Sequence, residues 1–437
     1  MLADTVNEKA LKLRLMIISL RTTRGVIVFV MAFGLLISNT MGFDGIKRRR
    51  SQFQTEFGYV VTPLPFILPG VGTGIGLLSG LNNILETPID LYLVFIRGDV
   101  EGSVLAVTDI PLLPQYLLLD LTSVSFNKGQ QNRYLKRGME SAQDDFNIVE
   151  LADSRLSGGR VILTFYERML EFYGVAYNIN FKISAIRDNK GNLTSDIDDP
   201  VTLESTTTTF GTLVDYTDDR SDPKKGVRFF MERSNSPSAG DGDVNYYVMN
   251  YSLAGYVPVL KYSTLALNYF RSDAHVISKG VTDPEILKLD FGCSEASIGL
   301  CDSSIQEVVQ DQVSQNTYGS AETLGGRSRL RSYVGNRFNG AHSEFIGTEL
   351  RWNLTNENTP FDIGIMKDLR TGIQLAFFHE VGTVADFRDD LWQQSRYSTG
   401  VGARLVTGSG FIYRFDVAYG DEGAATTLFI DYPWGTL

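Results

Sequence analysis

The composition of this 437-residue chain excludes several classes of protein before any motif is considered. Its mean hydropathy of -0.05 is too low for a bundle of membrane-spanning helices, which would need several apolar runs of about 20 residues. The net charge of -11 argues against a nucleic-acid-binding role, for which a basic surface is expected. The 42 Gly, 26 Phe and 20 Tyr residues suit a β-barrel, in which only alternate residues face lipid, but a large soluble β-sandwich would have similar numbers.

An apolar run near the amino terminus predicts a secretory signal peptide. Residues 25–38 are apolar and follow five Lys and Arg residues, which is the layout of a basic region before a hydrophobic region. The alternative is a membrane anchor, which the short length of the run disfavours. We therefore expect a signal peptide in residues 1–45, with cleavage between about Ser38 and Gly45 and with translation from Met16 as an alternative start. No cysteine directly follows the run, which excludes a lipoprotein anchor.

Four alternating glycines mark the first strand that the sequence predicts. Gly70, Gly72, Gly74 and Gly76 would leave one face of this strand without side chains. Such a face weakens the strand and lets another backbone approach closely, so the glycines indicate either a compliant join or a small-residue face toward a lumen. They do not predict a nucleotide-binding loop, because the pattern is not Gly-x-Gly-x-x-Gly and follows no strand–helix unit.

The sequence predicts eleven strands before a long polar loop and five after it, about sixteen in all. Residues 127–143 are polar and are expected to form a loop. The eleven earlier strands are expected near residues 72–83, 88–97, 100–108, 116–126, 144–152, 159–170, 176–186, 206–217, 226–234, 245–256 and 260–272.

The long loop is expected at about residues 272–342, because its first part is too polar to span lipid and too long for a turn. It contains the two cysteines of the chain, Cys293 and Cys301. In a secreted chain, two close cysteines in one loop most simply form a disulfide, which here would stabilise by a few kcal/mol at most. The alternative is a pair of reduced thiols. A metal site is disfavoured, because His275 is the one nearby imidazole.

Strict alternation after this loop predicts strands with charged residues on the inside of a barrel. In 346–354, 373–381 and 411–419, aliphatic and aromatic residues dominate one face, which is typical of lipid-facing positions. A shift of one residue would invert the two faces, so the consistent placement of the charges supports the alignment. The charged residues on the inward faces are Glu349, Arg351, Glu380, Arg414 and Asp416.

Two motifs in this region resemble the bacterial surface antigen family of outer-membrane barrels, the BamA/TamA assembly factors and their relatives. The first is similar to the Gly-Gly…(Val/Leu)-Arg-Gly-(Phe/Tyr) tip of that family's inward-folded loop, and it consists of Gly325, Gly326, Leu330, Arg331, Ser332 and Tyr333. The second is similar to the family's Phe-x-Asp-x-Gly strand, with Phe378, Glu380 and Gly382 at the matching positions. Ser332 stands for the usual glycine and Glu380 for the usual aspartate.

Weaker matches follow the same order along residues 206–432. They comprise an Asp-rich turn at 215–226, the strand that ends in Glu349-Leu350-Arg351-Trp352, and the segments 400–404 and 414–418, the latter with Arg414 and Asp416. Residues 51–205 match the family only in general character.

The resemblance implies that Arg331 reaches into the barrel and pairs with Glu380. A buried guanidinium without a partner would cost several kcal/mol, and Glu349 on the preceding strand is a plausible second acceptor. Such a clamp would pin the loop inside the barrel. The alternative is that Arg331 is an ordinary solvated loop residue.

The resemblance also implies a labile seam between the first and last strands. We expect the glycine-rich strand near 72–78 to meet the terminal strand near 426–432 there. After the leader, about sixteen strands of roughly 9–11 residues with their loops would use residues 51–437, which leaves no room for the POTRA repeats of relatives. The chain therefore resembles a barrel-only member.

Three classes of function follow from these observations. The first is an outer-membrane protein assembly or translocation barrel, the second a passive pore or structural barrel, and the third a lipid-acting enzyme. We expect no enzyme, cofactor or metal, because the chain has three histidines, no Gly-x-Ser-x-Gly motif and no metal-binding spacing. The expected partners are the lipid bilayer of the bacterial outer membrane and either unfolded outer-membrane proteins or a separate periplasmic partner, with no nucleic acid.

Overall fold

The structure is a computed structural model that describes most of the chain from residue 46 onwards. The described residues are 46–134, 136–197, 202–236, 242–290, 303–355, 361–363, 366–369, 372–406, 412–430 and 432–434. Two units are distinguished, Met1–Lys47 and Arg48–Leu437. The predicted signal peptide at 1–45 and the predicted disulfide between Cys293 and Cys301 lie outside the described residues.

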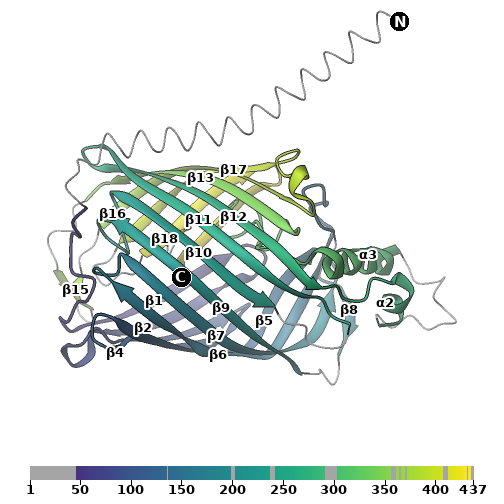
Figure 1. Ribbon diagram of the computed structural model, residues 1–437, viewed down its shortest axis with the longest axis horizontal. Helices are drawn as coiled ribbons and strands as arrows, with labels where there is room; N and C mark the ends of the chain where they lie inside the picture. Colours follow the sequence, from purple (N-terminus) through teal and green to yellow (C-terminus); the bar gives the residue numbers. More distant parts are fainter. Residues whose placement is uncertain are drawn as a thin grey trace, which may run out of the picture. The chain divides into compact units, whose positions relative to one another are not determined.

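In the unit Arg48–Leu437, sixteen antiparallel strands of the described residues close into a barrel (Figure 1). Each strand pairs with the next along the chain, and β19 returns to β1. The strands are β1 (Gly58–Leu68), β2 (Gly72–Asn82), β3 (Asp90–Gly98), β4 (Glu101–Leu113), β5 (Leu117–Tyr134), β6 (Phe146–Phe165), β7 (Leu170–Arg187), β9 (Thr202–Thr217), β10 (Gly226–Ser236), β11 (Asn245–Leu260), β12 (Ser263–Ser278), β13 (His342–Asn353), β16 (Gly372–Ala385), β17 (Arg396–Val406), β18 (Ile412–Gly420) and β19 (Gly423–Ile430). The predicted all-β transmembrane barrel is confirmed.

The described residues also form shorter elements outside the sixteen barrel strands. A short strand, β8 (Leu193–Asp196), pairs with the end of β7, and β14 (Phe361–Ile363) forms a hairpin with β15 (Met366–Leu369). The loop after β12 carries α2 (Pro284–Asp290) and α3 (Ser303–Tyr318), while η1 (Ile84–Glu86) and η3 (Arg388–Asp390) are single 3₁₀ turns. Among the described residues, no helix has the length and apolar character needed to cross a membrane.

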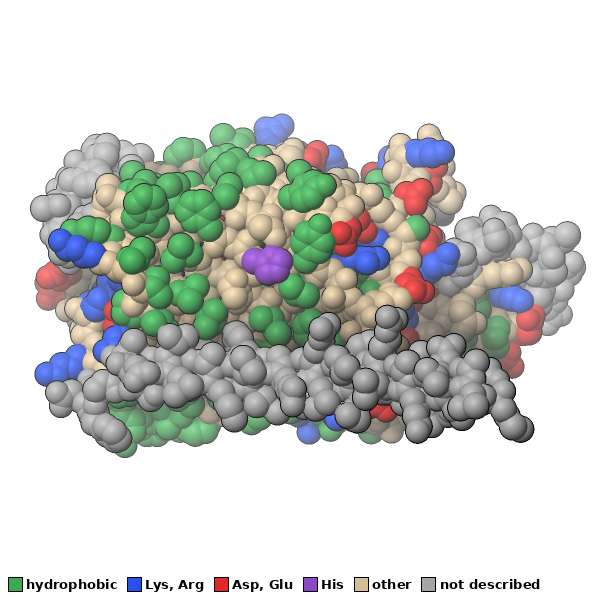
Figure 2. Space-filling view, turned by 90° about the horizontal axis from the view of Figure 1, so that it is seen from above, with side chains coloured by type: hydrophobic (Ala, Val, Ile, Leu, Met, Phe, Trp, Pro, Cys, Tyr) green, Lys and Arg blue, Asp and Glu red, His purple; other side chains and the backbone are tan. Residues whose placement is uncertain are grey.

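The predicted alternation is confirmed in the strands after the loop. In β16, Ile373 and Phe377 are 43% and 46% exposed, whereas Phe378 and Glu380, which point to the other face of the strand, are buried. The same period of two runs through β13 and β18, with Phe411 outside the described residues. Figure 2 shows hydrophobic side chains over much of the outer wall and charged side chains mostly towards the two ends. The outward positions therefore form the lipid-facing surface of a transmembrane barrel.

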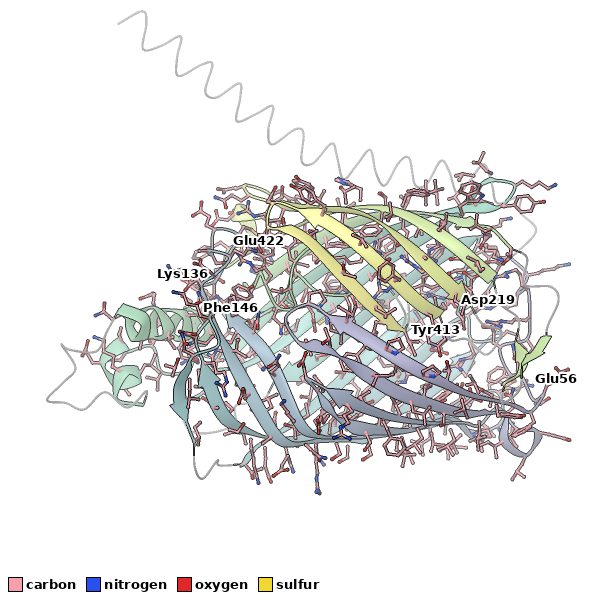
Figure 3. The ribbon with its side chains drawn as sticks, turned by 180° about the vertical axis from the view of Figure 1, so that it is seen from behind. Glu56, Lys136, Phe146, Asp219, Tyr413 and Glu422 are labelled. Atoms are coloured by element: carbon pink, nitrogen blue, oxygen red, sulfur yellow. The ribbon has the colours of Figure 1, made fainter. Side chains whose placement is uncertain are left out.

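The two ends of the barrel differ in their connections. One end holds the start of β1, the end of β19 and mostly short turns, and the other holds α2, α3 and the longer loops. Short turns face the periplasm in outer-membrane barrels and long loops face outwards. Figure 3 shows Asp219 and Glu56 towards the periplasmic end, and Lys136, Phe146 and Glu422 towards the outer end.

The predicted strand count is correct because two errors cancel. β1 was not among the predicted strands, because Pro63 and Pro65 argue against a strand, since proline has no N–H to donate. In addition, β6 was predicted as two strands, near 144–152 and 159–170. A bulge between Ala152 and Arg155 interrupts the alternation there, while the strand itself continues.

Two predicted loop boundaries also differ from the structure. Residues 127–134 belong to β5 and not to a loop, because β5 continues beyond the apolar band, where polar residues are tolerated in a strand. The long loop begins after Ser278, since β12 remains paired with β11 to that residue. It therefore spans 279–341 and not 272–342.

We predict that the detergent-folded protein gives a far-ultraviolet circular dichroism spectrum dominated by β-structure. It should also migrate faster on electrophoresis before boiling than after, because closed barrels resist detergent unfolding. A spectrum dominated by helix would contradict the barrel.

Candidate functional site

A hairpin-like tip of the long loop folds back among inward-facing side chains. Leu324 and Phe338 exchange two backbone hydrogen bonds of 2.9 Å and are fully buried. Both pack with Phe270 and Phe345 of the barrel wall in one apolar cluster. The chain reverses at Gly325, which has a φ of +111° and where a Cβ would clash with the Val334 carbonyl oxygen. These contacts fix the direction in which the tip residues point.

The tip places Arg331 in the middle of three carboxylates. Its Nε donates to Glu380 Oε1 at 2.8 Å, and its backbone N–H donates to Glu380 Oε2 at 2.9 Å. Its Nη1 lies 2.9 Å from both Glu349 Oε2 and Asp416 Oδ2. The guanidinium also lies 3.4 Å above the centre of the Phe378 ring, and the Arg331 side chain is fully buried. The structure thus brings Arg331 together with both nominated acceptors and with a third, Asp416.

Further arginines join these carboxylates across neighbouring strands. Arg404 of β17 contacts Glu349 Oε2 at 3.1 Å and also donates to Asp416 Oδ1. Arg351 of β13 donates to Glu349 Oε1 at 3.0 Å. These side chains are at most 2% exposed. Glu349 and Asp416 therefore keep other cations if Arg331 is removed.

Glu380 differs from the other two carboxylates in its pairing. Among the residues that the structure describes, Arg331 is the one cation within ion-pair distance of Glu380. Glu380 is fully buried, and a buried carboxylate without a cation is strongly destabilising. The position of the loop and the charge of Glu380 therefore depend on each other.

The remaining residues of the two motifs lie around this cluster. The Ser332 N–H donates to Ser398 Oγ at 2.9 Å, and Tyr333 packs edge-to-face on Phe338 with ring centres 5.0 Å apart. Gly382 faces the loop, because a Cβ there would lie 2.7 Å from Leu324 Cδ1. Arg414 lies 3.7 Å from Asp416 and is fully buried. Both motifs therefore meet on the inner wall formed by β13 and β16–β18.

Arg404 and the glycines that make room for it were part of a weak family match at 400–404 but were not predicted to belong to the site. A Cβ at Gly402 would clash with Asp416 and Arg404, and a Cβ at Gly400 would clash with the ring of Phe378. The signal was present as two glycines at alternate inward positions of β17. It could be interpreted only once the register of β17 against β18 placed Gly402 opposite Asp416.

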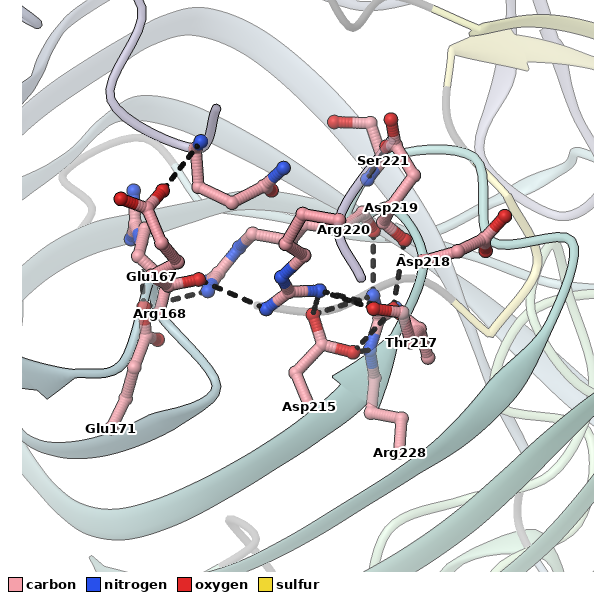
Figure 4. A network of polar contacts seen from close by, with 12 residues as sticks. Glu167, Arg168, Glu171, Asp215, Thr217, Asp218, Asp219, Arg220, Ser221 and Arg228 are labelled. Carbon is pink, nitrogen blue, oxygen red and sulfur yellow. Dashed lines mark hydrogen bonds and ion pairs between the residues drawn. The ribbon is translucent and has the colours of Figure 1, made fainter. Parts of the chain in front are cut away.

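A second polar network lies at the periplasmic end, and sequence reasoning recognised only the turn that carries it. Asp215 is fully buried and pairs with Arg228 at 2.9 Å and with Arg48 at 3.1 Å. Arg48 also donates to the Thr217 carbonyl oxygen at 3.0 Å. Figure 4 shows Asp215, Thr217 and Arg228 converging at the turn between β9 and β10.

The same turn holds the segment that leads into β1. Arg49 pairs with Asp218 at 2.9 Å, and Arg50 pairs with Asp219 at 2.7 Å. Phe53 then packs against inward-facing apolar residues of the barrel. Residues 48–53 are therefore fixed at the periplasmic mouth by charge pairs and by one aromatic anchor.

The closing join between β1 and β19 is the least paired join of the described barrel. β1 pairs β2 from Gly58–Asn82 through Leu68–Gly72, whereas β1 and β19 pair only at Ile67 and Leu428. Alternate residues of a strand direct their backbone N–H groups to the same neighbouring strand. Pro63 and Pro65 are two such alternate residues, and proline has no backbone N–H group. Because the β1–β2 ladder is continuous through both prolines, we infer that the missing donors fall on the β19 side.

This arrangement corrects the predicted position of the seam glycines. Gly72, Gly74 and Gly76 lie in or at the start of β2, between β1 and β3, and Gly70 lies in the turn before it. None of them faces β19. A Cβ at Gly74 would lie 2.6 Å from the ring of Phe66, so this glycine accommodates an inward aromatic side chain of β1. The prediction failed because β1 itself was not recognised as a strand.

Comparison with known proteins finds similar structures but no similar sequence family. No protein-family model matches the chain, and no curated protein matches it. The structure is similar to BamA from Haemophilus ducreyi lacking POTRA domains 1–3, with 12% identity and a TM-score of 0.49 over 87% of this chain and 70% of that one. It is also similar to CdiB from Escherichia coli, with 13% identity and a TM-score of 0.47 over 85% of this chain and 62% of that one. CdiB from Acinetobacter baumannii gives 11% identity and a TM-score of 0.46 over 85% and 59%. The chain thus spans less than two thirds of either CdiB chain.

We predict that Arg331→Ala and Glu380→Gln each destabilise the folded barrel. Removal of Arg331 should cost about 3–5 kcal/mol, because it leaves the buried Glu380 without its cation. The double variant should lose less than the sum of the single losses, since the two side chains share one interaction. Urea unfolding of the barrel in detergent measures these changes.

A matched control for this cycle is Arg97→Ala. The Arg97 side chain is 87% exposed and has only a 4.0 Å ion pair, so its loss should change stability little. Full additivity of the Arg331 and Glu380 changes would show that the two side chains do not interact.

Proposed function

We propose that this chain is a bacterial outer-membrane barrel that acts through the β1–β19 seam, as a barrel-only relative of the BamA/TamA family. In this proposal it accepts a strand of an unfolded outer-membrane protein, or admits lipid, without covalent chemistry. The observation that carries the proposal is the join itself, which is paired at Ile67 and Leu428 alone. Every other join between adjacent barrel strands is paired over a longer stretch of the described residues.

The physical basis is the state of the backbone at this join. Backbone N–H and C=O groups at membrane depth must be paired, and each unpaired group costs up to several kcal/mol. By the pairing of Ile67 with Leu428, Pro65 of β1 lies opposite Ile430, the last residue of β19, so it leaves backbone groups at that end of β19 without an N–H donor. An incoming strand with a complete set of donors could satisfy them, which is the same chemistry as strand addition at a sheet edge.

The buried ion-pair cluster around Arg331 also supports this proposal, because it lies on the strands that precede β19. Arg331 ties the loop to β13, β16 and β18, so this wall should stay rigid while the seam opens. We propose that the Arg331 clamp preserves the geometry of the strands that lead to β19. We also propose that a separate periplasmic partner delivers the unfolded outer-membrane proteins to this barrel.

A structural barrel without client handling is the second candidate. The filled interior of the barrel favours this candidate. The loop tip packs with Phe270 and Phe345 inside the barrel, and residues 48–53 are bound by ion pairs at its periplasmic end. Such a barrel would not need an opening seam. The two candidates therefore differ in the effect of locking β1 to β19.

We predict that a disulfide between Ile67→Cys and Leu428→Cys abolishes activity and that reductant restores it. The two residues are direct partners, and both side chains lie on the outward face. Activity is measured as the level of other outer-membrane proteins and lipids in cells that depend on the variant. The matched control is Ile67→Cys with Thr73→Cys, which locks β1 to its permanent partner β2.

The control pair should leave activity unchanged, because β1 and β2 do not need to separate. Normal activity with the Ile67–Leu428 disulfide fully formed would reject the seam and favour a structural barrel.

A further inference from the structure

The loop tip contacts both edges of the seam at its outer end. On one side of the seam, the Gly335 N–H donates to the Pro69 carbonyl oxygen at 3.0 Å in the turn between β1 and β2. In the same turn Gly70 has a φ of +78°, and a Cβ there would lie 3.0 Å from Val334 Cβ. The outer end of β1 is therefore packed directly against residues 334–335.

On the other side, Arg337 holds the turn that begins β19. Its Nε lies 2.9 Å and 3.0 Å from the two oxygens of Glu422, and its Nη2 lies 2.6 Å from Glu422 Oε1. Glu422 directly precedes Gly423, the first residue of β19. A forked contact of this kind is directional as well as strong, so it positions the turn.

Arg337 is itself held in place by residues that belong to neither seam strand. Its Nη1 and Nη2 donate to Ser141 Oγ and the Ser141 carbonyl oxygen at 2.5 and 2.6 Å. The guanidinium lies 4.5 Å from the centre of the Tyr134 ring and 4.6 Å from that of Phe338. Its side chain is 1% exposed, whereas that of Glu422 is 15% exposed at the rim. The cation is therefore preorganised, and the carboxylate is the part that can leave.

We propose that residues 334–337 form a latch that holds the outer end of the seam closed, with Arg337 as the positioning residue that retains β19. Release of Glu422 from Arg337 would remove the ion pair that holds the β18–β19 turn and leave the 3.3 Å hydrogen bond from the Asp421 N–H to the Tyr333 hydroxyl, while Gly335 would still hold the turn after β1. The proposal depends on the seam opening that we propose as the function, but the latch can be measured without any client.

The test measures the distance across the outer end of the seam in the full chain in outer-membrane vesicles. Spin labels at Thr73→Cys and Ala424→Cys report this distance by pulsed electron resonance, since both positions are exposed. With Arg337 intact, one short distance is expected. Arg337→Gln and Glu422→Gln should each raise the population with a longer distance at least about five-fold, as expected for losing a coupling of this kind.

The matched control is Arg137→Gln. Arg137 also makes a forked contact at the outer end, 2.6 to 3.2 Å from Asp386, but this contact holds the turn after β16 and not the seam. This variant should leave the distance unchanged. An equal increase with Arg137→Gln would show general loosening of the loops and would overturn the latch.

Glu422→Gln is the milder of the two substitutions, because glutamine keeps an acceptor oxygen at the rim and Arg337 keeps its two hydrogen bonds to Ser141. An unchanged distance in a Glu422→Gln barrel that retains heat-modifiable migration would overturn the latch, whatever its activity. A longer distance with no change in client assembly would support the latch and reject the proposed function. The two proposals can therefore fail separately.

Discussion

The pairing of Arg331 with Glu380 is the constraint on which the rest of this barrel depends. Glu380 faces the interior from the middle of β16 and is fully buried, and among the described residues its cation comes from a loop and not from the wall. A buried charge cannot remain unpaired without a large loss of stability, so the loop has to enter the barrel. Once Arg331 is in place, the bonds between Leu324 and Phe338 determine where the rest of the tip lies.

Stability is distributed unevenly around the barrel as a result. The wall from β13 to β18 is joined through a continuous set of buried ion pairs, while β1 and β19 share a single partner pair among the described residues. Pro65, which lies opposite Ile430, removes one N–H donor on the β19 side of β1 without weakening the ladder to β2. A barrel that has to open can therefore do so at one join while the neighbouring strands remain in register.

Sequence reasoning reached the parts of the site that depend on local pattern. Alternation in β13 and β16 was sufficient to place Glu349 and Glu380 inside, and the tip motif was sufficient to nominate Arg331 as their partner. The bridging role of Arg404 was not accessible, because it requires the register that sets Gly402 opposite Asp416. The seam was misplaced for a different reason. Proline usually argues against a strand, and β1 is an edge at which two prolines are tolerated.

The loop tip has two anchors of different character. Arg331 is enclosed by strands that would stay together in the proposed seam opening, whereas Arg337 contacts a carboxylate on the turn that would move with β19. Loss of the second contact leaves the first intact, because Arg331 makes no contact with Glu422 or with β19 among the described residues. In the proposed opening, the tip would therefore remain inside the barrel as a fixed support while β19 is released. Under this proposal, one loop would both stabilise the wall and control the join between β1 and β19.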